Sequence, residues 1–505
     1  MTAGGASPAD GKRLGVQMSK KIVGVVALAG LCALSLFLLN CGTTSSRPSG
    51  LLYALTQGYN GEGATGIGYN VSSFAMDFNN GNLSLINSNA STCPAASSTN
   101  PFPCGLPLDI LLDPTGTAAF VLNQGVPCLQ QGTVCVSSSN NPVAPSIYPY
   151  TVNSDGSLSN PGTAVTWTAN AYPDTAVAMV RDAAGQFLFV IDQGSYPSPG
   201  YPTPSPTNPS CPHAPTSQTD VCPSISVFAI QGTTLTLASG SPFYLSKIPT
   251  SLSPITFTPP GGAAQELLFV TNNFDICTSG CVLPPPSDNT VSVYSVSSSG
   301  TLSEQPNSPY IVAAADPISV IAVNTNPAVQ GENTGALFVY VGNQDANGGH
   351  LYPFQVCTVV NNTDCTQADV NNNLMVPVAT CSQPSCNVAP SGVGQSPVEM
   401  LVDPTNSFLY VVSEGSNQVF AFRISPSVGT LTALSPANQP TGSAPVSMAM
   451  HPTVYVDGNY TGQFLYVSNS GSNNITGFTL STTSGAMSNP ISVIAPAGPS
   501  GIAAH

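Results

Sequence analysis

The sequence predicts an all-β fold, a seven-bladed β-propeller of four-stranded antiparallel blades. A short apolar run, a polar corner and a second run bearing an aromatic residue occur together seven times along the chain. Charged residues make up only 6% of the chain, whereas there are 46 Gly and 48 Pro, a composition typical of strands joined by many turns. The last residues also match the segment that precedes the seventh copy, so the C-terminus is expected to complete the first blade.

Residues 1–40 are interpreted as an export leader. Lys20 and Lys21 precede an apolar run, and a start at Met18 would place both lysines at the beginning of the leader. The leader is followed directly by Cys41 and resembles a bacterial lipoprotein signal, which implies that Cys41 is lipidated and attaches the chain to a membrane. An uncleaved membrane anchor and ordinary secretion stay open as alternatives. All three place the rest of the chain outside the cytoplasm, in the cell envelope or beyond it.

A Ser/Thr/Pro/Gly tether, residues 41–50, precedes the predicted propeller, residues 51–505. The part of the chain after Cys41 holds four basic and 22 acidic residues. So negative a surface excludes nucleic acid as a partner and favours cations, or neutral and cationic ligands. We expect a monomer that binds a ligand of the envelope or the extracellular space.

Twelve cysteines remain when Cys32 and Cys41 are set aside, and they form six closely spaced pairs. The even number and the short spacing predict disulfides in an oxidising compartment. Zinc binding is the alternative, although only His213 lies near any pair. The predicted pairs are Cys93 with Cys104, Cys128 with Cys135, Cys211 with Cys222, Cys277 with Cys281, Cys357 with Cys365, and Cys381 with Cys386.

Each repeat predicts four strands, a to d, in order along the chain. Strand a is an apolar run led by proline, strands b and c are the two runs of the motif, and strand d follows a Gly-x-Leu-like turn. The mean period of about 69 residues exceeds that of compact blades, so the excess is assigned to loops. Strand b is predicted to begin at Leu51, Ala118, Phe187, Leu267, Leu337, Phe408 and Phe464, and strand a to open at Pro107, Pro173, Pro249, Pro317, Pro397 and Pro445.

One aromatic residue occupies a fixed place on each strand c. Because it recurs in every copy, we expect it to fill the core between neighbouring blades rather than to stack on a ligand. Residues 499–505 (PSGIAAH) match residues 445–451 (PVSMAMH) and are therefore expected to supply strand a of the first blade, which would leave no open sheet edge. The seven aromatic residues are Phe74, Tyr150, Phe228, Tyr294, Phe354, Phe422 and Phe478.

Residues 403–424, DPTNSFLYVVSEGSNQVFAFRI, resemble the YVTN-type propeller repeat and the lactonase-like seven-bladed propellers. The resemblance covers roughly residues 50–505. It implies a hydrolase that acts on a sugar lactone, similar to 6-phosphogluconolactonase, with His, Arg and Glu around a central cavity. No histidine directly follows a strand-a proline, and Arg181, Lys247 and Arg423 are few cations for a phosphorylated substrate.

Two functions therefore stay open, and whether the protein is an enzyme is uncertain. The leading expectation is a cell-envelope module that binds or scaffolds a protein, a glycan or an ion. The alternative is the lactonase-like hydrolase, for which the sequence identifies no catalytic residues. A turn role is expected at the shared position between strands a and b, which is occupied by Asp113, Asp182, Asp403, His451 and His505.

Four carboxylates predict a cation site at one mouth of the channel. Each lies within two residues of a strand-a proline, on four different blades. Grouped around one axis, they would repel one another unless a cation lay among them or their pKa values rose. Oxygen ligands of this kind suit Ca²⁺, whereas four solvated carboxylates on a wide rim are the alternative. The four residues are Asp109, Asp174, Asp316 and Glu399.

Overall fold

The chain divides into two units, Met1–Arg47 and Pro48–His505, and the computed structural model describes only residues of the second. The predicted leader and Cys41 therefore lie outside the described residues. Among the described residues no helix is long and apolar enough to cross a membrane. The described residues are 50–57, 70–91, 107–125, 130–131, 134–135, 144–159, 164–167, 175–194, 222–259, 262–275, 287–312, 316–325, 336–345, 348–358, 373, 375–378, 391–451, 455–456, 459–460, 463–495 and 498–505.

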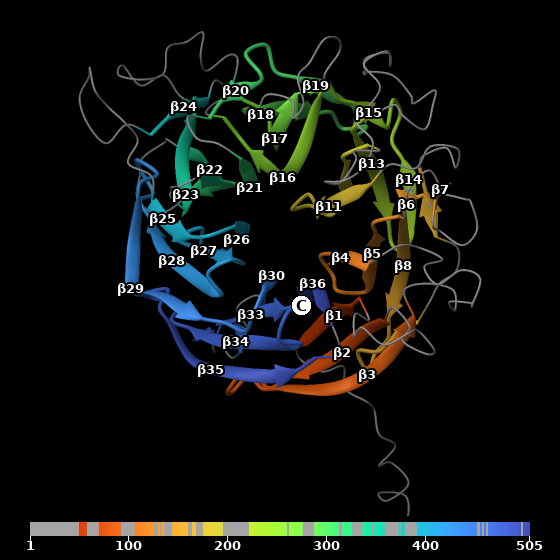
Figure 1. Ribbon diagram of the computed structural model, residues 1–505, viewed down its shortest axis with the longest axis vertical. Helices are drawn as coiled ribbons and strands as arrows, with labels where there is room; N and C mark the ends of the chain where they lie inside the picture. Colours follow the sequence, from red (N-terminus) through yellow and green to blue (C-terminus); the bar gives the residue numbers. More distant parts are fainter. Residues whose placement is uncertain are drawn as a thin grey trace, which may run out of the picture. The chain divides into compact units, whose positions relative to one another are not determined.

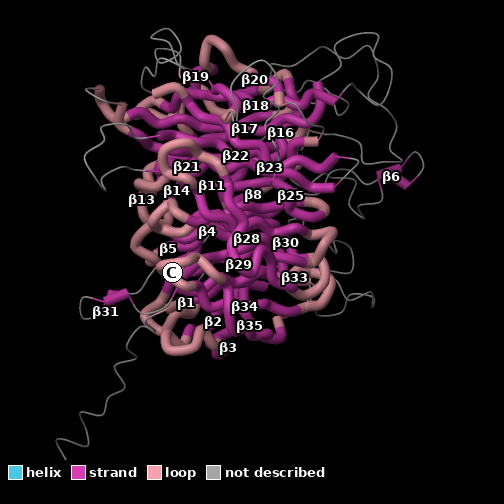
Figure 2. Tube along the Cα trace, turned by 90° about the vertical axis from the view of Figure 1, so that its left-hand side faces the viewer, coloured by secondary structure: helices cyan, strands magenta, loops and turns pink. Residues whose placement is uncertain are grey.

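Seven antiparallel sheets surround a common axis, as predicted (Figure 1). The described residues form strands, turns and loops, without a helix (Figure 2). Blades one to seven have as their innermost strands β36 (Pro499–Ala504), β4 (Pro107–Leu112), β11 (Ala176–Arg181), β16 (Lys247–Phe257), β21 (Pro317–Thr325), β26 (Pro397–Val402) and β30 (Pro445–His451). The second strands are β1 (Leu51–Thr56), β5 (Ala118–Asn123), β12 (Phe187–Asp192), β17 (Gln265–Asp275), β22 (Ala336–Asp345), β27 (Phe408–Ser413) and β33 (Gln463–Asn469).

The outer half of each blade carries the aromatic strand and an edge strand. The third strands are β2 (Asn70–Met76), β8 (Ser146–Val152), β13 (Ser224–Gln231), β18 (Ser287–Val296), β23 (Gly348–Val356), β28 (Gln418–Ile424) and β34 (Asn474–Leu480). The edge strands are β3 (Leu83–Ser91), β9 (Leu158–Ser159) with β10 (Val165–Thr166), β14 (Thr234–Leu237) with β15 (Phe243–Tyr244), β19 (Leu302–Glu304) with β20 (Tyr310–Ile311), β24 (Met375–Pro377) with β25 (Ser391–Gly394), β29 (Leu431–Pro440) and β35 (Met487–Ile494). Two hairpins lie outside the blades, β6 (Gln130–Gln131) with β7 (Val134–Cys135) and β31 (Tyr455–Val456) with β32 (Asn459–Tyr460).

Strand pairing corrects the predicted alignment at two places. In every blade the second residue of the strand-b motif pairs with the strand-c aromatic, as Leu409 does with Phe422. In blade five that residue is Val339, so the copy begins at Phe338 rather than at Leu337. In blade four strand a begins at Lys247, two residues before the predicted Pro249, whereas Pro173 of blade three lies outside the described residues. Apolar runs with several similar neighbours allow such slips of register.

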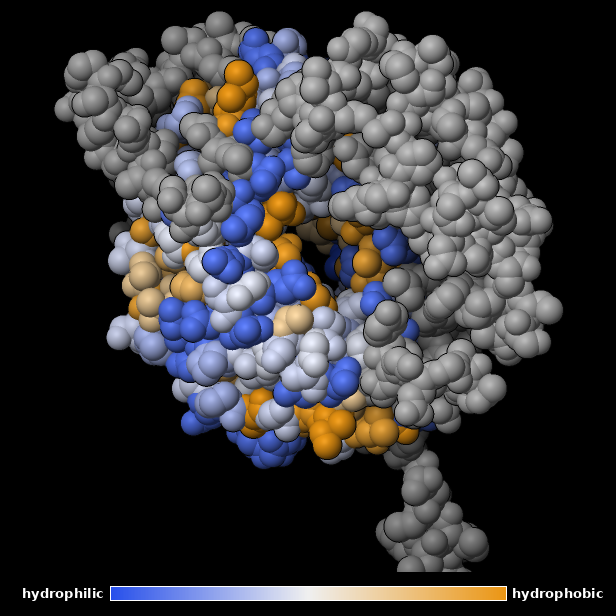
Figure 3. Space-filling model, viewed as in Figure 1, coloured by the Kyte–Doolittle hydropathy of each residue, from blue (hydrophilic) through white to orange (hydrophobic). Residues whose placement is uncertain are grey.

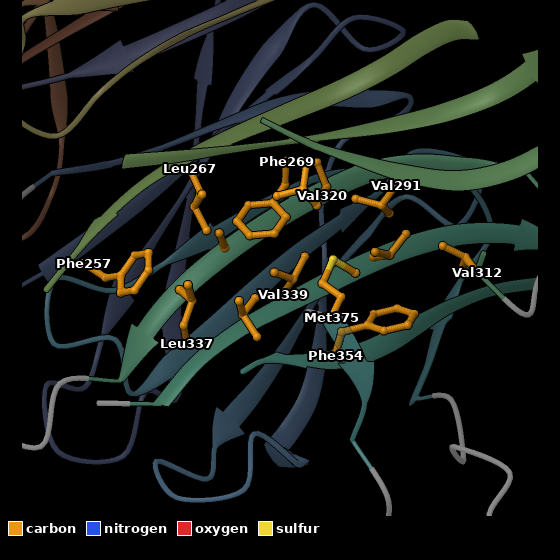
Figure 4. Close-up of a cluster of buried hydrophobic side chains, with 14 residues drawn as sticks. Phe257, Leu267, Phe269, Val291, Val312, Val320, Leu337, Val339, Phe354 and Met375 are labelled. Carbon is orange, nitrogen blue, oxygen red and sulfur yellow. The ribbon is translucent and has the colours of Figure 1, made fainter. Parts of the chain in front are cut away.

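The cores lie between adjacent blades, as predicted for the aromatic residues. All seven strand-c aromatics are 9% exposed or less. Figure 4 shows one interface, where Leu267 and Phe269 of blade four face Val339 and Phe354 of blade five. Because each blade shares its apolar faces with both neighbours, no blade has a complete core of its own.

A buried tyrosine hydroxyl ties each of four blades to its neighbour. Tyr466 donates a hydrogen bond to the carbonyl oxygen of Gly81 at 2.7 Å, which links blade seven to blade one. Gly81 has φ +74, and a β-carbon there would lie 2.5 Å from the ring of Phe464, so glycine is required on both counts. The same tyrosine-to-glycine bond joins blades one and two, five and six, and six and seven. The recurring tyrosine of the motif is thus explained by contact between blades.

The C-terminal strand closes the ring, as predicted. β36 pairs with β1, and the backbone groups of Leu51 and His505 exchange two hydrogen bonds of 2.8 and 2.9 Å. On its other side β36 packs against β4 so closely that a β-carbon on Gly501 would lie 2.7 Å from the α-carbon of Asp109. The first blade is therefore built from both ends of the propeller sequence.

Two of the twelve paired cysteines can be assessed. Cys222 and Cys357 are disulfide-bonded, and both are fully buried. Their predicted partners, Cys211 and Cys365, lie outside the described residues. Each of the other four predicted pairs also includes a residue outside that part of the chain, so the six pairings stay predictions.

Candidate functional site: the central channel

A cavity of about 740 Å³ runs along the propeller axis and is lined by the innermost strands of all seven blades. Figure 3 looks into this hollow and shows both apolar and polar residues around it. Sites of roughly 300–1,000 Å³ enclose small organic ligands, so the cavity is large enough for one.

A β-bulge at the start of strand a determines which side chains face the cavity. In blade six, for example, the pairing of β26 with β27 shifts between Pro397 and Glu399. The bulge leaves one extra residue on strand a, and in blades two to seven the two residues that follow Pro107, Ala176, Pro249, Pro317, Pro397 and Pro445 line the cavity. The same shift occurs at the start of β4, β11, β16, β21 and β30.

These two residues form two successive layers around the axis. The first residues after the strand start are mostly aliphatic, and we call Leu108, Val177, Ile318, Val398 and Val446 the apolar collar. The second residues are mostly polar, and we call Asp109, Ser251, Ser319, Glu399 and Ser447 the polar layer. Deeper along the axis come Leu111, Val180, Leu401 and Met450, which we call the apolar floor. The polar layer therefore lies between two apolar layers.

Glu399 extends from blade six toward blade seven. Its carboxylate accepts a hydrogen bond of 2.6 Å from the backbone N–H of Met448 and another from the side chain of Ser447. Burial and, to a smaller extent, the charge of Asp109 raise the pKa of Glu399 to about 8, against the lowering effect of these hydrogen bonds. Glu399 is thus a carboxylic acid that keeps its proton near neutral pH.

Asp109 has the corresponding position in blade two. Its carboxylate accepts hydrogen bonds from the backbone N–H of Ile110, at 2.8 Å, and of Met179 in blade three. Burial raises the pKa of Asp109 to about 7. The two carboxylates therefore share one cavity, and burial raises the pKa of each.

The predicted four-carboxylate site is only partly described. Asp109 and Glu399 line the cavity, Asp316 is not among its lining residues, and Asp174 lies outside the described residues. Within the described chain no group of three His, Cys, Asp or Glu side chains could hold a metal ion. Two carboxylates supply fewer oxygens than the six to eight that Ca²⁺ takes, so the described residues do not fit such a site. With Asp174 undescribed, Ca²⁺ binding stays a prediction, which a thermal-shift titration with Ca²⁺ can test.

The opposite end of the channel carries the residues that were expected to shape turns. The carboxylate of Asp403 accepts N–H bonds from Ser407 and Phe408 at 2.8 and 2.7 Å, and Asp113 and Asp182 make similar bonds, so the turn role is confirmed for these three. Arg181 also lines the cavity at this end and donates a hydrogen bond to the carbonyl of Asp182 at 2.9 Å. Arg423 lies away from the channel, 4.7 Å above the ring of Phe408.

Sequence reasoning found the two carboxylates but missed the layer that contains them. The bulge is not visible in the sequence, so strict alternation along the strand did not predict that two successive residues both face the channel. A signal was nevertheless present, because in five blades the polar-layer residue is the second after a proline.

Comparison with known proteins agrees with this architecture. Residues 383–492 match the family described as Lactonase, 7-bladed beta-propeller. No curated protein matches the chain. The periplasmic gluconolactonase of Pseudomonas aeruginosa is similar in structure, with a TM-score of 0.51 and 16% identity over 89% of this chain and 98% of that one. A protein from Lactobacillus plantarum has a TM-score of 0.51 and 13% identity, over 90% of this chain and 99% of that one. The expected resemblance to the lactonase-like seven-bladed propellers is thus confirmed, through the matched segment and through the fold of the chain.

Proposed function

We propose that the central channel hydrolyses an uncharged lactone and that Asp109 and Glu399 are its acid–base pair. The observation that carries the proposal is the presence of two carboxylates with raised pKa values in the central cavity of a lactonase-like propeller. Titratable groups whose pKa values are separated by their environment are typical of sites that perform acid–base catalysis.

The two pKa values assign the roles. Burial raises the pKa of Asp109 to about 7 and that of Glu399 to about 8, so we assign Asp109 as the base and Glu399 as the acid. Asp109 takes a proton from a water molecule, whose oxygen attacks the lactone carbonyl carbon. The bond between that carbon and the ring oxygen breaks, and Glu399 donates its proton to the departing oxygen. The product is a hydroxy acid, and proton exchange with water restores both carboxyl groups.

The charge of the channel supports an uncharged substrate. Of the three Lys and Arg residues in the described propeller, only Arg181 lines the cavity, and its guanidinium already donates to the carbonyl of Asp182. Recognition of a phosphate group typically uses several Arg or Lys donors. The gluconolactonase that shares this fold is named for a lactone without phosphate, which is consistent with this choice.

Lactone opening by the purified propeller tests the proposal. Proton release should exceed the spontaneous rate with uncharged lactones, and Glu399→Gln should reduce kcat by roughly 10²–10⁴-fold, the range for loss of a general acid. Gln keeps an oxygen to accept the Met448 N–H bond, so the variant should melt like the parent. Wild-type protein that opens none of a panel of uncharged lactones, or a fully active Glu399→Gln variant, would overturn the assignment.

The binding or scaffold role predicted from the sequence is the second candidate. It is favoured by the fact that both carboxylates already accept backbone N–H bonds from a neighbouring blade, as carboxylates with a structural role do. In that case a ligand would protect the protein against unfolding without being turned over. Thermal stabilisation by an intact lactone, glycan or ion in the absence of hydrolysis would support it.

We also propose that the propeller is exported and tethered to the cell envelope through a lipidated Cys41, with secretion as the alternative. The leader, the disulfide-bonded Cys222 and Cys357 and the periplasmic name of one structural neighbour support export. Protein isolated from the envelope should have almost no free thiol, and mass spectrometry of its N-terminal peptide should find an acylated Cys41. Several reactive cysteines would argue against export, and an unmodified Cys41 would argue against the anchor.

A further inference from the structure

The polar groups of the channel are few and most are already engaged. Thr250 donates to the carbonyl of Pro317 at 2.7 Å, Ser319 to that of Pro397 at 2.6 Å, and the side chain of Ser447 to the carboxylate of Glu399. Each bond joins one blade to the next at the start of strand a. These hydroxyl protons cannot be offered to a ligand without loss of a bond between blades, so the polar layer offers a ligand mainly the two carboxyl groups and the hydroxyl of Ser251.

The remaining lining is aliphatic on both sides of the polar layer. The apolar collar supplies five of the six lining residues at its level, and each of the five is partly exposed. The apolar floor repeats this arrangement at a deeper level, also with partly exposed side chains. Apolar surface that faces a cavity gains free energy when an apolar group replaces water there.

We infer that the substrate is a lactone bearing an aliphatic substituent, which lies against the apolar collar and the apolar floor while the ester group meets the polar layer. This inference rests on the proposed hydrolase function. A polyhydroxylated lactone fits less well, because those of its hydroxyl groups that lie against the apolar collar and the apolar floor would lose water without gaining a hydrogen bond. The cavity of about 740 Å³ also has the size of sites that hold ligands larger than a single ring.

A series of alkyl-substituted lactones tests the inference. For wild-type protein kcat/KM should rise by roughly fourfold for each added methylene that becomes buried, until the channel is filled. Glucono-δ-lactone should be a poorer substrate than a lactone of equal ring size with a butyl or hexyl group. Spontaneous opening of each lactone is measured separately and subtracted.

Two isoleucines of β21 provide a matched pair of variants. Ile318 belongs to the apolar collar, whereas Ile321 lies on the same strand outside the cavity lining. Ile318→Thr should reduce the gain per methylene, and Ile321→Thr should leave it at the wild-type value. Melting temperatures of both variants show whether each is folded.

The outcomes separate the inference from the function on which it rests. If no lactone is opened, the proposed function fails and the inference with it. If glucono-δ-lactone is preferred, or if kcat/KM is flat or falls with chain length, the function stands and the aliphatic substrate is refuted. A methylene gain that Ile318→Thr and Ile321→Thr leave equally unchanged would show that the collar does not bind the chain.

Discussion

The carboxylate of Glu399 in blade six accepts a 2.6 Å hydrogen bond from the backbone N–H of Met448 in blade seven. Asp109 in blade two is bonded in the same way to Met179 in blade three. These bonds fix the orientation of both carboxylates and join neighbouring blades within the channel. Preorganised groups of this kind need little free energy of reorganisation during the reaction, because the fold has already oriented them.

The proposed acid–base pair predicts a bell-shaped pH dependence of kcat/KM for lactone opening. Activity should rise as Asp109 becomes ionised near pH 7 and fall as Glu399 loses its proton near pH 8, because the base must be charged and the acid neutral. Initial rates between pH 5 and 10, corrected for spontaneous hydrolysis, measure the profile. A rate that simply follows hydroxide concentration would contradict the pair.

Asp192 predicts a pH dependence of stability in blade three. Burial raises its pKa from 3.8 to about 7, against the lowering effect of hydrogen bonds from Trp167, at 3.0 Å, and Ser224. The folded state thus keeps a proton that the unfolded chain releases above about pH 4. The contribution of Asp192 to the free energy of unfolding should therefore fall as the pH rises from about 4 to about 7 and stay level above pH 7. Asp192 pairs with Ala176 at the start of β11, whereas Arg181 ends β11 and Asp182 follows it. Neither Arg181 nor Asp182 therefore faces the Asp192 carboxyl group.

The variant Asp192→Asn tests that dependence. Asn occupies the equivalent strand position in other blades, where the amide of Asn272 donates to Thr290 and Ser292. Asp192→Asn should raise the free energy of unfolding at pH 8 by up to about 4 kcal/mol. Burial raises the Asp192 pKa from 3.8 to about 7, and each pKa unit corresponds to about 1.4 kcal/mol. Fluorescence of Trp167, the single tryptophan of the chain, reports the transition at pH 5 and pH 8. An equal effect at both pH values would show that Asp192 does not titrate in this range.

Gly501 predicts how the ring is closed. A β-carbon there would press on the backbone of Asp109, which cannot move as a flexible side chain can. Gly501→Ala should therefore lower the free energy of unfolding by about 1–3 kcal/mol, the usual cost of overpacking. Gly392→Ala is the matched control, because a β-carbon at that position meets nothing within 4 Å. Melting curves in which both variants are equally stable would show that β36 is not tightly packed against β4.

Most of the fold could be predicted because the repeat encodes it locally. The strand-c aromatics, the Gly-x-Leu turns and the proline-led strands each mark a place in one blade, and closure follows from the match of residues 499–505 to residues 445–451. The two alignment errors, at Phe338 and Lys247, arose where the apolar run is longer than the strand motif or the strand begins before its proline.

The site was less predictable because it is assembled across blades. Nothing near Glu399 in the sequence indicates that Met448 and Ser447 would be its partners, or that Asp109 would influence its pKa. Proximity to a strand-a proline selected Asp316 as readily as Asp109, although only Asp109 is among the residues that line the cavity. Burial, which raises both pKa values, depends on all seven blades and has no local signal.

A double-mutant cycle on Asp109 and Glu399 tests the central claim most directly. Lactone opening is measured for the wild type, Asp109→Asn, Glu399→Gln and the double variant, with melting curves to confirm that each is folded. If the two residues act as one acid–base unit, kcat/KM of the double variant should lie within about threefold of the weaker single variant, because the first loss already removes the concerted step. Losses that multiply, or single variants as active as the wild type, would contradict a catalytic pair in the channel.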